Sequence, residues 1–237
     1  ENMAGSVVLL TQAGDIDFNQ TAGTISGSGV GALLFAGDGG VTATFNGDVV
    51  AASQDGTGAN FAALGVFASE EIDLTLNGEV TATGDGAYAL MVLGGSAISV
   101  TNTGTISNFN SHNGVGINSV GEITDTDRED PDFDPANYLV SFTNSGTLNG
   151  DLDIRAIDYG VTVTNSELLN GYVEIVTNGA VNVTNTGRMM DGIFASGMES
   201  VSFSNSDFIR DGIHLIPDGN ISLANSGNYN ADNTHEG

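Results

Sequence analysis

The sequence has no cysteine, no lysine and no tryptophan, and only three of its 237 residues are proline. The absence of cysteine excludes disulfide bonds and cysteine-ligated metal, so a hydrophobic core and backbone hydrogen bonds must hold the fold. No segment approaches the roughly 18 consecutive apolar residues of a membrane-spanning helix, so we expect no direct membrane insertion. With 34 glycines against three prolines, turns should be frequent and built mostly from Gly or Asn.

Positive charge is nearly missing as well. Four Lys and Arg residues, all of them Arg, stand against 30 Asp and Glu, for a formal net charge of −26. Such a surface repels nucleic acid and anionic membranes, so we expect no nucleic-acid partner. Hydrophobic residues make up 40% of the chain and recur regularly, which favours a folded protein over a disordered one.

One seven-residue pattern recurs along the second half of the sequence. It reads VNVTNTG at residues 181–187, and related segments begin at residues 98, 140, 161, 201 and 221. Each contains an Asn at the same place, and these are Asn102, Asn144, Asn165, Asn185, Asn205 and Asn225. The steps between them are 42, 21, 20, 20 and 20 residues, a period typical of a solenoid, with one coil enlarged by an insertion.

The spacing within each repeat predicts three short strands. Apolar residues precede the Asn by two and four positions and follow it by four, eight and ten positions, as Val181, Val183, Met189, Ile193 and Ala195 do around Asn185. Alternation with period two indicates strands that bury every second residue. We therefore predict an all-β fold, a single right-handed parallel β-helix of about nine coils with three strands per coil.

The same alternation places the repeated Asn inside the coil. A buried polar side chain must be hydrogen-bonded, and the equivalent Asn in the next coil lies ~4.8 Å away. The six residues are therefore predicted to form a buried, stacked ladder, each bonded to its neighbours.

We interpret residues 1–237 as one solenoid with two parts. Residues 1–97 should form larger, irregular coils whose inward corner positions are Gln20, Gly47 and Gly78. Residues 98–237 should form regular coils of about 20 residues, interrupted by an acidic loop insertion at 124–137. At ~4.8 Å per coil, the rod would be roughly 40 Å long.

The repeats resemble the passenger domains of bacterial autotransporters and related surface adhesins. The resemblance lies in VTNTGTI (100–106), FTNSGTLNG (142–150), VTNTGRMMDG (183–192) and GDGAYALMV (84–92), and it covers nearly the whole chain. It implies an extracellular or cell-surface location and a structural or adhesive role. The chain lacks the amphipathic C-terminal barrel, an obvious folding cap and the Gly-Asp-Ser-Gly protease signature. We expect either a mature subunit or a piece of a longer chain.

Several functions fit such a rod. The first is adhesion to a cell-surface receptor or glycan. The second is head-to-tail stacking with neighbouring solenoid segments or like subunits into an extracellular fibre. A polysaccharide-active enzyme would need paired carboxylates, for which Asp191 and Asp211 lie at equivalent corners one coil apart. Solvated turn acids are the favoured interpretation of this pair, and we predict no catalytic residue and no cofactor-binding residue. Outward Ser and Thr pairs, such as Thr162 and Thr164, suggest ice binding as a further alternative.

A third-strand stripe breaks the alternation. Val176, Phe194 and Ile216 are apolar at outward positions, and the runs ALLF (32–35), FAALGVF (61–67) and YALMVL (88–93) do the same in the first half. Contiguous exposed apolar residues usually mark a contact surface, so we predict that these three residues contact a partner. The alternative is a wider cross-section that buries both parities against long loops.

The insertion holds six carboxylates in ten residues, and Pro131 and Pro135 exclude a regular central strand there. Calcium accepts irregular sets of oxygen ligands, so we predict a weak calcium site on Asp125, Asp127, Asp130 and Asp132. A solvated acidic loop explains the same composition, and the sequence leaves both interpretations open.

Overall fold

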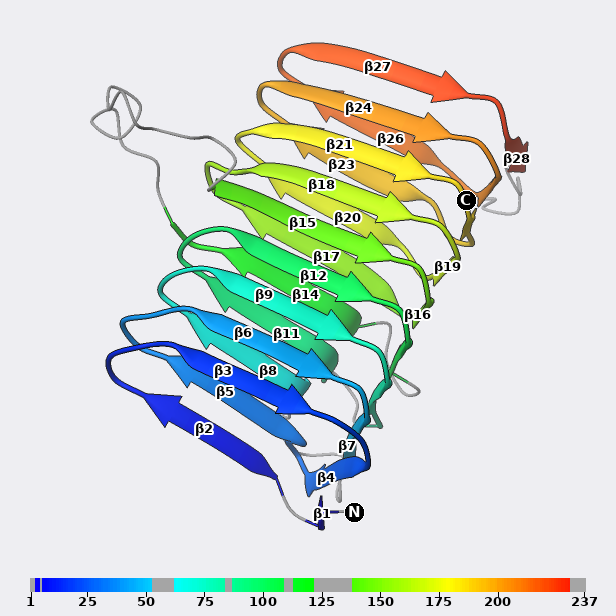
Figure 1. Cartoon of the computed structure of the whole chain (residues 1–237). Coiled ribbons are helices and arrows are strands. Elements are labelled where there is room, and N and C mark those ends of the chain that lie inside the picture. Colours follow the sequence, from blue (N-terminus) through cyan, green and yellow to red (C-terminus); the bar gives the residue numbers. More distant parts are fainter. Residues whose placement is uncertain are drawn as a thin grey trace.

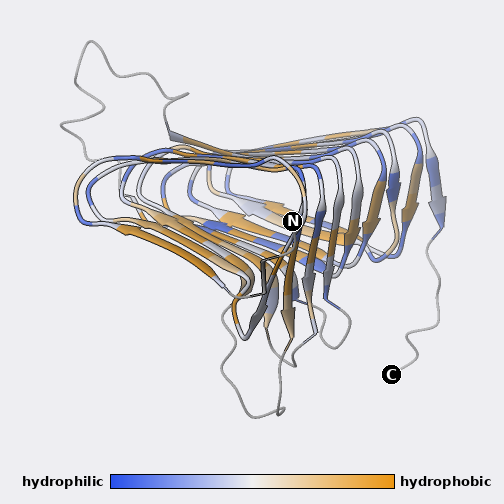
Figure 2. Cartoon of the chain, turned by 60° about the horizontal axis from the view of Figure 1, so that its bottom comes forward, coloured by the Kyte–Doolittle hydropathy of each residue, from blue (hydrophilic) through white to orange (hydrophobic). Residues whose placement is uncertain are grey.

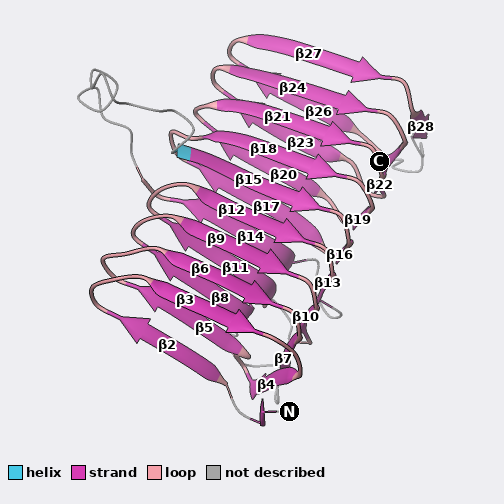
Figure 3. Cartoon of the chain, in the orientation of Figure 1, coloured by secondary structure: helices cyan, strands magenta, loops and turns pink. Residues whose placement is uncertain are grey.

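The computed structural model describes residues 3–4, 6–52, 62–83, 87–108, 113–121 and 138–230. Strands dominate these residues, and they stack into a rod with the first strands at one end and the last strands at the other (Figures 1 and 3). All strand pairs are parallel, and each strand pairs with the strand three places along the chain. The predicted right-handed parallel β-helix is confirmed. Among the described residues, no helix is long and apolar enough to cross a membrane.

Each coil contributes one strand to each of three sheets, which we name A, B and C. Sheet A has ten strands: β1 (Met3–Ala4), β4 (Thr24–Ser28), β7 (Asp48–Ala52), β10 (Glu79–Ala82), β13 (Thr105–Asn108), β16 (Thr147–Asn149), β19 (Leu168–Asn170), β22 (Arg188–Met189), β25 (Phe208–Arg210) and β28 (Asn228–Asn230).

Sheet B has nine strands: β2 (Val7–Thr11), β5 (Ala32–Ala36), β8 (Ala62–Ala68), β11 (Tyr88–Gly94), β14 (Asn113–Ser119), β17 (Asp151–Ala156), β20 (Val173–Thr177), β23 (Ile193–Gly197) and β26 (Ile213–Pro217).

Sheet C also has nine strands: β3 (Ile16–Gln20), β6 (Val41–Phe45), β9 (Ile72–Leu76), β12 (Ile98–Asn102), β15 (Leu139–Asn144), β18 (Gly160–Asn165), β21 (Ala180–Asn185), β24 (Ser200–Asn205) and β27 (Asn220–Asn225). Its strands run directly into the corner where the repeated Asn residues lie.

A continuous hydrophobic core fills the inside of the stack, running from Ile16 to Ile209. Along most strands buried residues alternate with more exposed ones, and Figure 2 shows that the strands carry much of the apolar sequence. Val161 and Val163, for example, are both fully buried in β18. Because every second side chain of all three sheets enters one narrow interior, short strands suffice to build a long core.

Glycine is required where the chain turns out of sheet C. A β-carbon on Gly78 would clash with the carbonyl oxygen of Gly47, and one on Gly104 would clash with that of Gly78. These turns stack directly on one another, so only a residue without a side chain fits there.

Candidate binding surfaces

The predicted Asn ladder is present along the inner corner after sheet C. Each side-chain amide nitrogen donates to the amide oxygen of the next Asn, from Asn102 through to Asn225, over distances of 2.6 to 2.8 Å. The nitrogens also donate to backbone carbonyls of the following turn, as Asn185 does to Gly187 at 2.8 Å. The ladder therefore satisfies buried polar groups along the rod and forms part of its interior rather than a binding site.

The two ends of the ladder differ from its middle. Asn102, Asn144, Asn165, Asn185 and Asn205 are at most 1% exposed. Asn225 is exposed, contrary to the prediction that all six are buried, because it lies in the last described coil and no described strand covers it. At the other end, the amide oxygen of Asn102 is buried and accepts no hydrogen bond, since the preceding strand places Leu76 beside it.

The inner corner of the first coils differs from the sequence prediction. The register pairs Asn102 with Leu76, Leu76 with Phe45, and Phe45 with Gln20. The prediction is confirmed for Gln20 and wrong for Gly47 and Gly78, which lie two residues beyond the corner positions Phe45 and Leu76. The Asn residues that precede these glycines lie outside the coil, where Asn77 donates to Asn46 at 2.7 Å and accepts from the Thr103 hydroxyl at 2.6 Å.

The outer face of sheet C carries an unbroken column of threonines over six coils. The register aligns Thr44, Thr75, Thr101, Thr143, Thr164 and Thr184. From β12 to β27 the outward positions of this sheet hold no charged residue, whereas Asp17 and Asp73 interrupt the same face in the first coils. In a chain of net charge −26, this part of the face is an uncharged, hydrogen-bonding surface.

The outer face of sheet B is apolar in the first four coils. Leu10, Phe35, Phe67 and Leu93 are aligned in one column, and Val8, Leu33, Gly65 and Met91 in the next. Leu10 is 67% exposed, Val8 51% and Phe35 44%. We call these two columns the apolar stripe. Leu33, Phe67, Met91 and Leu93 are partly buried. At the start of β8 the alternation stops, because Ala62 and Ala63 are both buried.

A groove lies within this stripe. It has a volume of about 300 Å³, and its lining is entirely apolar: Leu10, Val30, Leu33, Phe35, Ala62, Gly65 and Phe67. A β-carbon on Gly65 would lie 3.0 Å from the Phe67 ring and 3.2 Å from the Leu33 side chain. The glycine therefore leaves room for these two side chains to meet across the groove floor.

Farther along sheet B the outer face becomes polar. Arg155 pairs with Asp153 at 3.1 Å and with Glu174 at 3.2 Å. The negative charge of Asp153 is the main cause that raises the pKa of Arg155, and the hydrogen bond between the two side chains adds to it. Tyr88 ends the stripe on this side, with its ring over Gly116. Burial, followed by the charge of Asp153, raises the pKa of the Tyr88 hydroxyl.

The three residues predicted to contact a partner lie on this same outer face but do not form one column. Val176 and Ile216 share a column with Ser196 between them, and Phe194 lies in the adjacent column, between Glu174 and His214. Ile216 is 56% exposed, and the other two are partly buried. Val176 also lines a second groove of about 460 Å³ with Leu93, Val120 and Ile157. Their contact with a partner stays a prediction.

The candidate catalytic pair is bridged by a cation. Arg210 lies between the two carboxylates, 2.9 Å from Asp191 and 3.5 Å from Asp211. Asp211 has a backbone φ of 66°, a conformation that Asp tolerates in turns. Because one guanidinium bonds both carboxylates at an exposed turn, the arrangement matches an ion-paired corner.

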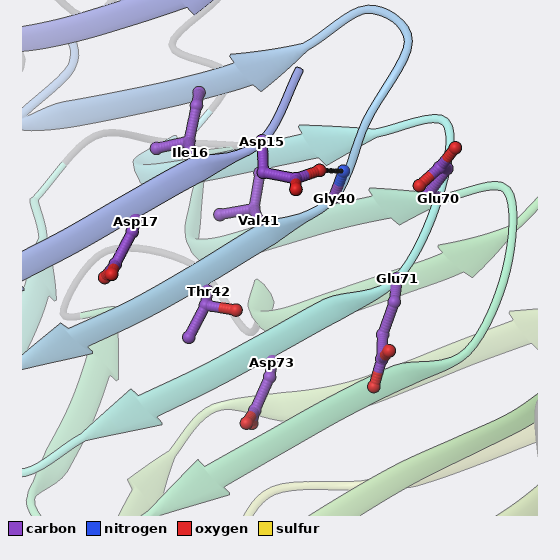
Figure 4. A pocket seen from close by; sticks show the side chains of 9 residues that line it. All are labelled: Asp15, Ile16, Asp17, Gly40, Val41, Thr42, Glu70, Glu71 and Asp73. Atoms are coloured by element: carbon purple, nitrogen blue, oxygen red, sulfur yellow. Dashed lines mark hydrogen bonds between the residues drawn. The ribbon is translucent and has the colours of Figure 1, made fainter.

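Acidic side chains gather at the corner between sheets B and C in the first coils. Asp15, Asp17, Glu70, Glu71 and Asp73 line a pocket of about 440 Å³ (Figure 4). Asp15 accepts a hydrogen bond from the Gly40 amide at 2.9 Å, and every ion pair of the described residues involves Arg155 or Arg210. We call these five residues the acidic corner. None of the described Arg residues forms an ion pair with them.

The predicted calcium ligands Asp125, Asp127, Asp130 and Asp132 lie outside the described residues, so that site stays a prediction. Within the described ranges, no group of three or more His, Asp or Glu residues is arranged to hold a metal ion. No protein-family model, curated protein or solved structure matches this chain.

Proposed function

We propose that this chain is a structural or adhesive rod segment of a secreted or cell-surface bacterial protein, acting by binding or assembly rather than catalysis. The observation that carries the proposal is the apolar stripe on the outer face of sheet B. Outward aromatic and aliphatic residues are aligned over four coils, most of them exposed in the first two and partly buried in the next two, and they are typical of a contact surface. The rigid stack below them would hold that surface in one shape.

The resemblance to autotransporter passenger domains supports the same location and role. So does the strongly negative net charge, which favours solubility and opposes non-specific association. Two kinds of partner fit the stripe: a receptor or glycan on another cell, and a like subunit or neighbouring solenoid segment.

Adhesion to coated beads would test this proposal. Beads carrying the purified protein should be retained on a bacterial or host-cell layer, and the triple variant Leu10→Ser, Phe35→Ser, Phe67→Ser should lose that retention. Circular dichroism of the variant checks that its fold is intact, and sedimentation velocity of both proteins reports assembly. A wild-type protein that neither adheres nor assembles, or that releases sugars from a polysaccharide, would contradict the proposal.

The threonine column supports a second candidate, binding to ice. Its hydroxyls repeat at the strand spacing of ~4.8 Å. Two water molecules that hydrogen-bond at ~2.8 Å to one tetrahedral neighbour lie about 4.5 Å apart, so a frozen water lattice nearly matches this column. The outward positions of sheet C from β12 to β27 hold no charged side chain that would have to stay hydrated, so ordered water could lie directly on this face.

An ice-recrystallisation assay separates this candidate from the first. Wild-type protein should keep ice grains small. The double variant Thr143→Tyr, Thr164→Tyr should abolish the effect, because the large side chains would prevent ice from contacting the face. The control Ser196→Tyr, on the outer face of sheet B, should leave it unchanged. Coarse grains with wild-type protein would eliminate ice binding.

A further inference from the structure

The apolar stripe and the acidic corner adjoin each other. In each of the first three coils the chain passes from the stripe to the pocket at the acidic corner: from Leu10 in β2 to Asp15, from Phe35 in β5 to Gly40, which also lines that pocket, and from Phe67 in β8 to Glu70. Glu70 follows Phe67 by three residues, which an extended chain spans in at most about 11 Å. One partner can therefore touch both surfaces at once.

The negative charge of this region has no internal balance. No Lys or Arg precedes Arg128 in the sequence, so residues 1–127 contribute acids and no strong base. Within the described ranges, the five carboxylates of the acidic corner make no ion pair, whereas in the second half Arg155 and Arg210 each bind two acids. Cations for the corner must come from outside this half of the chain.

From this juxtaposition we infer that the first coils bind a basic amphipathic polypeptide segment. Its apolar side chains would fill the groove between Leu10, Phe35 and Phe67, and its Lys or Arg residues would lie against the acidic corner. Charge complementarity favours this occupant over a second copy, because two chains of net charge −26 repel each other, and over an anionic membrane for the same reason.

The size of the stripe fits such a segment. Three strand intervals of ~4.8 Å give a length of about 14 Å, which matches two to three turns of an amphipathic helix laid along the rod axis. Lys and Arg can lie flat on apolar surface while their charged ends reach a neighbouring carboxylate. The inference rests on the proposed function, since it names the class of partner for the same stripe.

Fluorescence anisotropy with synthetic peptides tests the inference. The probe is a short amphipathic peptide of Leu and Lys, compared with a Leu/Gln peptide of the same apolar pattern and a Lys/Ser peptide of the same charge. Wild-type protein should bind the Leu/Lys peptide at least tenfold more tightly than either control, and the affinity should fall with added salt.

Three variants locate the binding site. The groove variant Leu10→Ser, Phe35→Ser, Phe67→Ser should lose the preference for the Leu/Lys peptide. The corner variant Glu70→Gln, Glu71→Gln, Asp73→Asn should weaken binding about tenfold, the product of three exposed charge pairs. The distal variant Glu167→Gln, Glu199→Gln, Asp207→Asn removes the same charge from exposed turns of the second half and should change binding less than twofold.

Equal losses in the corner and distal variants would overturn the inference, because binding would then reflect net charge alone. Binding of the Leu/Gln peptide as tightly as the Leu/Lys peptide would overturn the basic partner. Self-association that disappears only in the groove variant, without peptide binding, would assign the face to a second copy. If beads still adhere through the stripe while the peptides show no preference, the inference fails and the proposed function stands.

Discussion

The first and second halves of this rod build the same inner corner in two different ways. In the first coils Phe45 and Leu76 fill it with fully buried apolar side chains, whereas from Asn102 onward a column of hydrogen-bonded amides occupies the same position. The apolar corner accompanies coils of 25, 31 and 26 residues, and the amide corner accompanies coils that settle at 20. The amide also bonds the next turn, which ties each short coil to its neighbour.

The outer faces divide at the same place. The first coils carry the apolar stripe and the acidic corner, and the later coils carry an uncharged threonine face on sheet C and ion-paired arginines. The first half therefore exposes apolar and acidic groups on its surface, whereas the second half is ordered by hydrogen bonds inside the coil. Changes at matched positions in the two halves can test that division.

The largest effect is expected in the apolar corner. Phe45→Ala should lower the free energy of unfolding by about 3 to 5 kcal/mol, because it removes a fully buried ring and leaves a cavity. Chemical denaturation measures the loss, and Phe35→Ala, at an outward position of the preceding strand, should cost much less. Equal losses in the two variants would show that Phe45 does not support the corner.

Extending the ladder by one coil gives the next effect. Leu76→Ala should cost about 2 to 5 kcal/mol as a buried truncation. Leu76→Asn should cost less than Leu76→Ala, because its amide can donate to the oxygen of Asn102 that now accepts no hydrogen bond. Denaturation curves of the two variants compare them directly, and a larger loss for Asn would mean that the corner of this coil cannot hold an amide.

Breaking the ladder in the second half should cost less than emptying the apolar corner. Asn185→Leu leaves the groups bonded to Asn185 without a partner, at about 1 to 3 kcal/mol. The matched control is Asn182→Leu, at an exposed position of the same strand, which should stay within about 0.5 kcal/mol. If both substitutions have the same effect on unfolding, the buried hydrogen bonds do not stabilise the stack.

The smallest effect is expected for the outer polar contacts of the first half. Asn77 bonds Asn46 and Thr103, much as the ladder residues bond one another, but it is exposed. Water replaces these hydrogen bonds when they are lost, so Asn77→Ala should change the free energy of unfolding by no more than about 0.5 kcal/mol. A loss as large as that of Asn185→Leu would show that burial does not decide the strength of these amide contacts.

The fold and the ladder of the second half follow directly from the sequence. Alternation with period two, repeated about every 20 residues, identifies which residues enter the core, and steps of 21, 20, 20 and 20 residues from Asn144 to Asn225 leave one consistent way to stack the coils. Short, nearly identical coils have a single register, because any shift would separate the Asn from its equivalents in every interface at once.

Tertiary structure alone decided the register of the first half and the shape of the outer surfaces. Gly47 and Phe45 are two residues apart, so both fit the alternation, and only pairing with Gln20 and Leu76 in the neighbouring strands distinguishes them. The apolar stripe arises in the same way, since Leu10, Phe35 and Phe67 are separated by 25 and 32 residues and become neighbours only when unequal coils are stacked. A sequence pattern indicates which way a side chain points. Which side chains meet across coils depends on where each strand begins and ends, and packing between neighbouring coils decides those boundaries.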